Sequence, residues 1–270
     1  MLVLGARGWS RKQQIAVVEM EGAIGPRLKP GEYAKLFRSL EENQRVKAVV
    51  LDVDSPGGSA SGSDYLYLSV SALARKKPVV AFIRGVGASG AYLFSCPAQK
   101  IVAIPSAIIG SIGVISIRPL VYETMERLGL KVNVTKSDRL KDMGSMFREP
   151  TPEEREKEQA LVDELYDQFI DAVAEGRKME REAVRQIATG EIFTGRKGKD
   201  LGLVDELGDM DRAIDIAADL ANAPRNPVWM RPRRGLRDLI GQFVTRSFVD
   251  QLAAAADDRL RTGVYYQYGP

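Results

Sequence analysis

The sequence predicts an α/β domain built around a parallel β-sheet. Two apolar runs rich in β-branched residues, 46–53 and 78–83, are each followed by a glycine-containing turn and then by a helix-like segment. Runs of this length and composition are typical of buried strands. Successive strand–turn–helix units favour parallel strands that are joined by right-handed crossovers. A chain of 270 residues is also long enough to bury a sizeable core.

The first half of the chain supplies the sheet and the helices that cover it. Strands are expected where short apolar runs occur, at residues 14–20, 46–53, 78–83 and 100–104. Pro30 followed by Glu32 is typical of a helix start. Helices are expected to follow the turns after the first three strands, over residues 30–40, 60–73 and 91–96.

The second half begins with a predicted helix over residues 119–128 and a predicted strand over residues 131–135. Residues 136–148 are mostly polar and show no periodicity, so they are expected to be irregular. Thr151, Pro152 and the two acids that follow are typical of a helix N-terminus. A long helix is predicted to begin there, and one of its faces is apolar, with Leu161, Leu165, Phe169 and Val173. Two shorter helices are expected at residues 181–188 and 210–220. A connection is expected between them, at residues 190–195.

Three parts are predicted along the chain: an N-terminal tail or anchor remnant at residues 1–13, one domain at 14–225, and a basic amphipathic segment at 226–270. In the last part a cluster of arginines precedes apolar residues at helical spacing, and residues 264–268 are predicted to be an exposed tail. Two roles are open for this segment. It could pack on a neighbouring subunit, or it could make a peripheral contact with an anionic membrane surface.

Composition restricts the chemistry. The chain has no histidine and one cysteine, Cys96. A Ser-His-Asp triad, histidine zinc sites, thiolate clusters and an internal disulfide are therefore excluded. The net charge of +3 is too small to indicate a nucleic-acid partner. Because no run of about 18 apolar residues occurs, no transmembrane segment is predicted, and the chain as given is expected to be soluble.

One turn is a candidate catalytic site. Ser89 lies beside glycines, after the predicted strand at 78–83 and before the predicted helix at 91–96. Such a strand-to-helix turn resembles a nucleophile elbow, although Ala91 breaks the Gly-x-Ser-x-Gly pattern. Close packing of small residues is the alternative explanation. If Ser89 is a nucleophile, its base must be a lysine or a carboxylate, because serine needs a base and histidine is absent.

Five motifs occur in a characteristic order. They are Asp-Ser-Pro-Gly-Gly at 54–58, Gly-Ala-Ser-Gly-Ala-Tyr at 87–92, Gly-Ser-Ile-Gly at 110–113, Lys-Asp-Met-Gly-Ser at 141–145 and Gly-Leu-Val-Asp-Glu-Leu-Gly at 202–208. With these motifs the chain resembles the SppA-type signal peptide peptidases of the ClpP/crotonase superfamily, over roughly residues 14–220. The resemblance implies a ClpP/crotonase-like α/β fold of repeated ββα units, with a parallel sheet and a helical C-terminal part.

The resemblance also implies roles for individual residues. Ser89 matches the nucleophile and Lys141 the general base of a Ser-Lys dyad, while Ser111 matches a serine that orients the lysine amine. The N–H groups that match the oxyanion hole belong to Gly57, Gly58 and Gly90. No metal or other cofactor is expected, and the expected partners are peptide substrates.

The function implied is a serine endopeptidase that cleaves apolar, extended peptides such as remnant signal peptides. A lysine base needs a pKa lowered from about 10.4 toward roughly 7–8, which burial can achieve. Family members are usually membrane-anchored, and half-length members form closed oligomers whose serine and lysine come from neighbouring protomers. A homo-oligomer with shared sites is therefore expected. Two alternatives are a crotonase-type acyl-CoA hydratase or isomerase, which usually uses carboxylates, and a non-catalytic peptide-binding scaffold.

Overall fold

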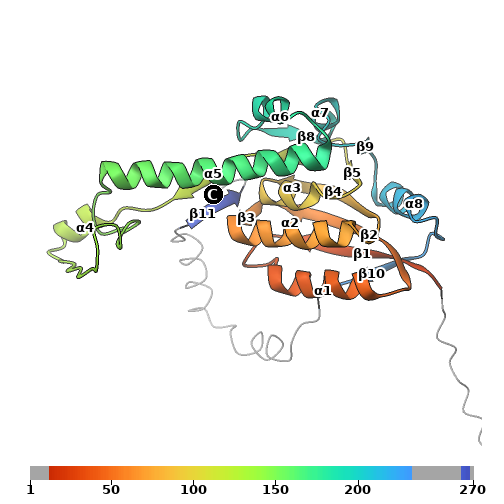
Figure 1. The fold of residues 1–270 in the computed structure, drawn as a ribbon, viewed down its shortest axis with the longest axis horizontal. Coiled ribbons are helices and arrows are strands. Elements are labelled where there is room, and N and C mark those ends of the chain that lie inside the picture. The colour runs from red at the N-terminus through yellow and green to blue at the C-terminus, as the bar shows by residue number, and fades with distance from the viewer. Residues whose placement is uncertain (1–11, 233–262, 268–270) are drawn as a thin grey trace, which may run out of the picture.

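A twisted sheet forms the centre of the computed structural model, which describes residues 12–232 and 263–267 (Figure 1). The strands of the structure, which belong to this sheet or to a second, smaller one, are β1 (Gln14–Glu21), β2 (Val46–Ser55), β3 (Gly57–Ser59), β4 (Val79–Ala88), β5 (Lys100–Ala103), β6 (Ile108–Gly110), β7 (Ile115–Ile117), β8 (Ile192–Thr194), β9 (Glu206–Leu207), β10 (Pro227–Met230) and β11 (Gly263–Gln267). Its helices are α1 (Pro30–Glu42), α2 (Ala60–Ala74), α3 (Gly90–Ser95), α4 (Tyr122–Arg127), α5 (Pro152–Arg177), α6 (Arg181–Ile187), α7 (Gly195–Asp200) and α8 (Met210–Leu220).

The main sheet is parallel through its centre. Its strands lie in the order β10-β1-β2-β4-β5-β9, and each neighbouring pair along this path is parallel. β6 pairs with the end of β4, and β8 pairs with β6 in the antiparallel direction. The apolar residues of β1, β2 and β4 are buried on both faces, as is typical of parallel strands covered by helices. The predicted α/β class with a parallel sheet is confirmed.

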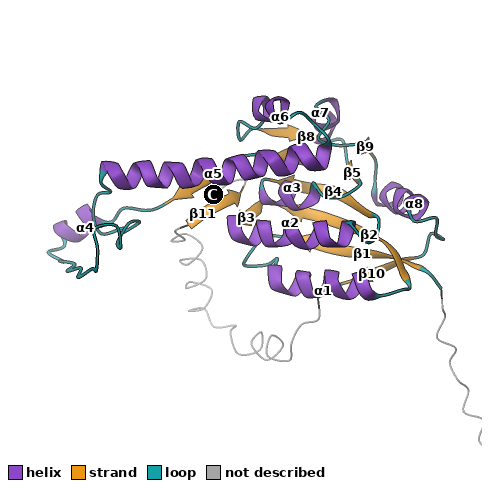
Figure 2. Cartoon of the chain, viewed as in Figure 1, coloured by secondary structure: helices purple, strands orange, loops and turns teal. Residues whose placement is uncertain are grey.

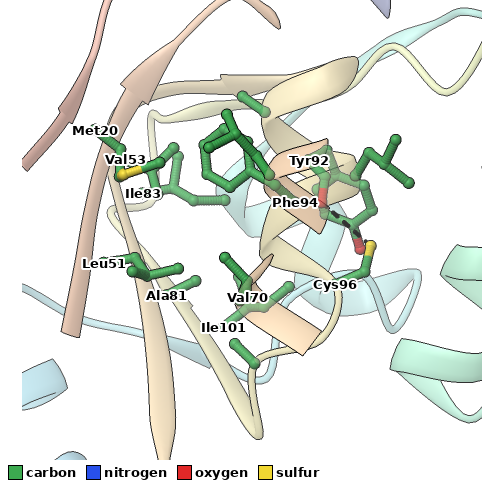
Figure 3. Close-up of a cluster of buried hydrophobic side chains, with 14 of the residues drawn as sticks. Met20, Leu51, Val53, Val70, Ala81, Ile83, Tyr92, Phe94, Cys96 and Ile101 are labelled. Carbon is green, nitrogen blue, oxygen red and sulfur yellow. Dashed lines mark hydrogen bonds between the residues drawn. The ribbon is translucent and has the colours of Figure 1, made fainter. Parts of the chain in front are cut away.

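Helices cover both faces of the sheet (Figure 2). On one face, Leu51 of β2 and Ala81 of β4 belong to the same buried cluster as Val70 of α2 and Tyr92 and Phe94 of α3 (Figure 3). The intervening residues of the same strands pack against α8 on the opposite face. Because successive side chains of a strand point to opposite faces, one apolar run fills two cores.

Three expectations for the second half of the chain are wrong. Residues 131–135 form no strand, and they are exposed and pair with no described strand. Residues 190–195 are more than a connection, because they include β8 and the start of α7. The expected tail at 264–268 instead contributes to β11, which joins β3 and β7 in a separate antiparallel sheet. A short strand forms only where another strand offers it an edge, and sequence periodicity does not reveal that edge.

The segment of residues 118–150, here called the arm, projects from the body of the molecule beside the first part of α5 (Figure 1). α5 is 26 residues long, and only its second half is packed into the core. Phe169 and Val173 are buried, whereas Leu161 on the same predicted face is 43% exposed. Neither α5 nor any other helix of the described residues combines the length and apolar character needed to cross a membrane.

Candidate active site

Ser89 occupies the tight turn between β4 and α3. Its N–H donates to the carbonyl of Gly110 in β6 at 2.8 Å, and its carbonyl accepts from the Leu93 N–H at 3.0 Å, which begins the helix. The Ser89 backbone has φ 54° and ψ −123°. This is the conformation of the second residue of a type II′ turn, a position that glycine normally fills. A serine held there is strained, and strain of this kind clusters at functional sites.

Two glycine segments meet at this turn. A Cβ on Gly90 would clash with α2 and lie 3.2 Å from Ile24 Cδ1. A Cβ on Gly58, where φ is 158°, would lie only 2.3 Å from the Ile24 carbonyl oxygen. Ile24 therefore packs against both glycines and brings β3 next to the start of α3. The Gly57 N–H donates to Ser55 Oγ at 3.2 Å, so this N–H already serves the local turn.

Ser111 lies next to the Ser89 turn. It directly follows Gly110, whose carbonyl accepts from Ser89, and its own N–H donates to the Glu191 carbonyl at 2.7 Å. Ser111 is 8% exposed, and its φ of 49° is also positive. The other non-glycine residues with positive φ in the described chain follow helices, where a left-handed residue is common, at Lys178 and Asn222. The two strained serines have no such explanation.

A cavity of about 540 Å³ opens beside Ser111. Its volume is in the range of small-ligand pockets. On its wall, the Tyr166 hydroxyl donates to the Ala188 carbonyl at 2.6 Å, which fixes the ring. The cavity is lined by Ser111, Gly113, Val114, Ile115, Val162, Asp163, Tyr166, Ala188, Thr189 and Gly190.

Lys141 is not brought to the Ser89 turn within one chain. It is exposed in the arm, where its N–H donates to the Asp138 carbonyl at 3.1 Å. The arm is attached to Glu154 at the start of α5, whereas the cavity beside Ser111 touches α5 from Val162 onward. At about 1.5 Å per residue, the α5 segment between these two positions is about 12 Å long. Figure 1 shows the arm and α3 at different places along α5.

A network of charges that the sequence analysis missed holds the turn next to Lys141. The Arg148 guanidinium lies between two carboxylates: Nε donates to Asp142 Oδ2 at 2.9 Å, and Nη1 donates to Glu154 Oε2 at 2.8 Å. Lys136 Nζ also donates to Asp142 Oδ1, at 2.6 Å. Glu154 belongs to the capping box at the start of α5. The capping motif is a local sequence signal, but both carboxylates are six residues away from Arg148, and no periodic pattern indicates their pairing.

Arg148 lowers the pKa of both carboxyls, chiefly through its hydrogen bonds to them. The pKa of Glu154 falls to about 2, and the pKa of Asp142 falls well below its usual range. A carboxyl with a lowered folded-state pKa stabilises the fold fully above its unfolded pKa, about 4, and this contribution is lost as the pH falls through the folded pKa. The arm is therefore expected to stay attached at neutral pH and to loosen only in strong acid.

Replacing Arg148 by methionine should loosen the arm. The change keeps an apolar stem but leaves the buried Glu154 carboxylate without its charged partner. Amide hydrogen exchange of residues 138–147 should become at least about tenfold faster. Arg155→Met is the matched control, because Arg155 pairs with Glu149 on the surface, with exposures of 58% and 64%. Equal exchange rates in the two variants would contradict this role for Arg148.

Most of the large apolar side chains that are exposed to solvent lie in the arm or next to it. Of fourteen such exposed residues in the described chain, ten lie between Ile115 and Leu161. Leu128, at 69%, is the most exposed of them. A further cavity of about 500 Å³ lies within the arm and is lined in part by Met125, Leu130 and Phe147. A concentration of exposed apolar side chains of this kind marks an interaction surface.

Known proteins resemble this chain in sequence. The sequence model for Peptidase family S49 matches residues 71–224. A protein of Methanocaldococcus jannaschii that is named as a protease is 43% identical over 190 residues, which cover 70% of this chain and 61% of that protein. The chloroplastic serine protease SPPA of Arabidopsis thaliana is 33% identical over 245 residues, which cover 85% of this chain and 36% of that protein. The chain thus matches less than two thirds of the length of either relative.

The fold also has relatives among solved structures. A mutant of ClpP1 from Listeria monocytogenes superposes with a TM-score of 0.50 and 16% sequence identity, covering 72% of this chain and 92% of that chain. At this identity the likeness concerns the fold alone. It confirms the expected ClpP-like arrangement of strands and helices.

Proposed function

Because the chain belongs to peptidase family S49, we propose that it is a serine endopeptidase in which Ser89 is the nucleophile and Lys141 of a neighbouring protomer is the general base. The observation that carries this proposal is the Ser89 turn, where a buried serine holds a backbone conformation that normally requires glycine. The absence of histidine from the sequence makes lysine the natural base.

In the proposed reaction, the Ser89 hydroxyl attacks the carbonyl carbon of the scissile peptide bond while the Lys141 amine accepts the hydroxyl proton. The resulting ammonium gives this proton to the leaving amine as the C–N bond breaks. A water molecule, deprotonated by the same amine, then hydrolyses the acyl-enzyme and restores Ser89. Ser111, which adjoins the turn, is proposed to orient the amine.

The oxyanion hole is proposed to consist of two backbone N–H groups. We assign the N–H groups of Gly58 and Gly90 to this role, because both glycines pack against Ile24. The N–H of Gly57 is a weaker candidate, because it donates to Ser55 Oγ. Fixed donors of this kind stabilise the charge that develops on the carbonyl oxygen of the transition state.

The general base is proposed to come from a second copy of the chain. A base must lie within about 2.6–3.2 Å of the hydroxyl it deprotonates. In one chain Lys141 is exposed in the arm, which is held at the start of α5, whereas the cavity beside Ser111 touches α5 only from Val162 onward. The apolar side chains of the arm, such as Leu128, offer a surface that a neighbouring protomer can bury. The same contact would remove water from Lys141. We therefore expect a closed homo-oligomer with shared sites.

The proposed substrates are apolar, extended peptides, including remnant signal peptides. The cavity beside Ser111 suits an apolar substrate side chain. Its lining includes Val114, Ile115, Val162 and Tyr166. A peripheral membrane contact through residues 231–270 stays a prediction, because residues 233–262 lie outside the described part of the chain.

A fluorophosphonate probe tests the assignment of the nucleophile. The probe should label the full chain at Ser89 and should not label Ser89→Ala. Ser95→Ala is the matched control, since Ser95 is also buried in α3 but its hydroxyl donates to the Ala91 carbonyl. This control should be labelled like the unmodified chain. Labelling of Ser89→Ala at the unmodified level would contradict the assignment, and no labelling of any form would favour a scaffold or a hydratase.

A further inference from the structure

β4 has a bulge shortly before the Ser89 turn. The register of β2 and β4 pairs Val53 with Ile83, which lie next to each other in Figure 3, and then Ser55 with Gly87. Between these two pairs, Asp54 alone on β2 lies opposite the three residues 84–86 on β4. Bulges bend a strand and often occur next to active sites, where they change the direction of a side chain.

The bulge is also the point at which β4 changes its neighbour in the sheet. Before the bulge β4 pairs with β5, and from Val86 onward it pairs with β6. The pairing with β6 ends at Ala88, and Ser89 follows directly. The direction in which β4 presents Ser89 therefore depends on the conformation of residues 84–86.

The Asp54 carboxylate fills the bulge. Its Oδ1 accepts a hydrogen bond from the Val86 N–H at 3.0 Å, and its Oδ2 lies 3.0 Å from Nη1 of Arg84. At the residue between these two, a Cβ on Gly85 would lie only 2.5 Å from Asp54 Oδ1. One carboxylate therefore holds both ends of the bulge and packs against its middle residue.

The main chain of Asp54 is connected to the proposed oxyanion hole. Its carbonyl accepts from the Gly22 N–H at 2.9 Å, and the Ile24 N–H, two residues further on, donates to the Gly57 carbonyl at 2.8 Å. Ile24 is the residue that packs against Gly58. Asp54 thus joins the segment with the proposed oxyanion donors to the strand that leads to the proposed nucleophile.

We propose that Asp54 is a positioning residue: by holding the β4 bulge, its carboxylate fixes the Ser89 hydroxyl relative to the oxyanion N–H of Gly58. The inference rests on the proposed function for the reaction at Ser89, whereas the bulge and its contacts with Asp54 belong to the fold. Asp54 acts through the main chain of β4. A misplacement of reacting groups by about 1 Å can lower a rate by roughly 10²-fold.

Three variants of the full-length chain test this role. Asp54→Ala removes the acceptor of the Val86 N–H, whereas Asp54→Asn keeps an acceptor oxygen of the same length. Glu21→Ala is the matched control. Glu21 is opposite Asp54 in register and also binds Arg84, 3.0 Å from Nη2, so this change removes a carboxylate from the same guanidinium and leaves the Val86 hydrogen bond in place.

The first measurement is the rate at which a fluorophosphonate labels Ser89, with thermal unfolding to show that each variant is folded. The rate should fall at least about tenfold in Asp54→Ala and stay within about twofold of the parent rate in Asp54→Asn and Glu21→Ala. The second measurement is amide hydrogen exchange of residues 85–89, which should become at least about tenfold faster in Asp54→Ala alone.

Gly85→Ala gives an independent variant, because its Cβ would displace the Asp54 carboxylate without removing it. It should slow the labelling of Ser89 as Asp54→Ala does, and the double variant should be no slower than Asp54→Ala alone. Losses that add in the double variant would contradict the proposal.

Equal labelling rates in Asp54→Ala and Glu21→Ala would overturn the proposal, as would a rate in Asp54→Asn as low as that in Asp54→Ala. The exchange measurement separates this inference from the proposed function. If the probe labels no form of the chain but exchange becomes faster in Asp54→Ala alone, the role of Asp54 in the bulge is supported and the proposed peptidase is contradicted.

Discussion

Replacing either Ser89 or Lys141 by alanine should lower kcat for peptide hydrolysis by at least about 10³-fold, because neither group of the proposed dyad can act without the other. The fold should survive both changes. Alanine keeps the Cβ of Ser89 in its strained turn, and Lys141 is exposed in the single chain, so neither change opens a cavity in the core. Lys157→Ala, which removes an exposed lysine from α5, should retain full activity.

Steady-state kinetics with a fluorogenic apolar peptide, together with thermal unfolding of each variant, separate lost chemistry from lost structure. Loss of kcat at an unchanged unfolding temperature supports the dyad. Substantial turnover by Lys141→Ala would move the role of general base to another group, and a carboxylate would then be the next candidate, since the sequence has no histidine.

The central strands could be predicted because a strand that is buried on both faces has a nearly continuous run of apolar residues in its sequence. Residues 46–53 are almost uninterruptedly apolar, and in the sheet they face both cores. The start of α5 could be predicted for a similar reason, because Thr151 and Glu154 of its capping box are three residues apart.

The short strands could not be predicted, because their existence depends on a partner far away in the sequence. Residues 131–135 alternate lysine and asparagine with valine and look like a strand, but they pair with no described strand. β11 is the opposite case: its residues have no distinctive periodicity, and its partners β3 and β7 lie about 150–200 residues earlier.

The candidate site could be predicted in part. The motif around Ser89 indicates a strand-to-helix turn, and the structure has that turn with Gly58, Gly90 and Ser111 around it. The position of Lys141 could not be predicted from its motif. Its distance from Ser89 depends on the direction in which the arm leaves the body, and that direction is fixed by α5 and by Arg148 rather than by residues next to the lysine.

Mixing two inactive variants tests the shared site most directly. If Ser89 of one protomer works with Lys141 of the next, Ser89→Ala and Lys141→Ala chains that are dissociated, mixed in equal amounts and reassembled will form some sites with both groups intact. Each site needs an intact serine and an intact lysine from different chains, with a chance of one half each, so roughly a quarter of the unmodified activity should return. Mixing Ser89→Ala with the double variant should restore none. Activity that stays at the level of the separate variants after reassembly, or an active species that is strictly monomeric by light scattering, would contradict a site completed by a neighbouring chain.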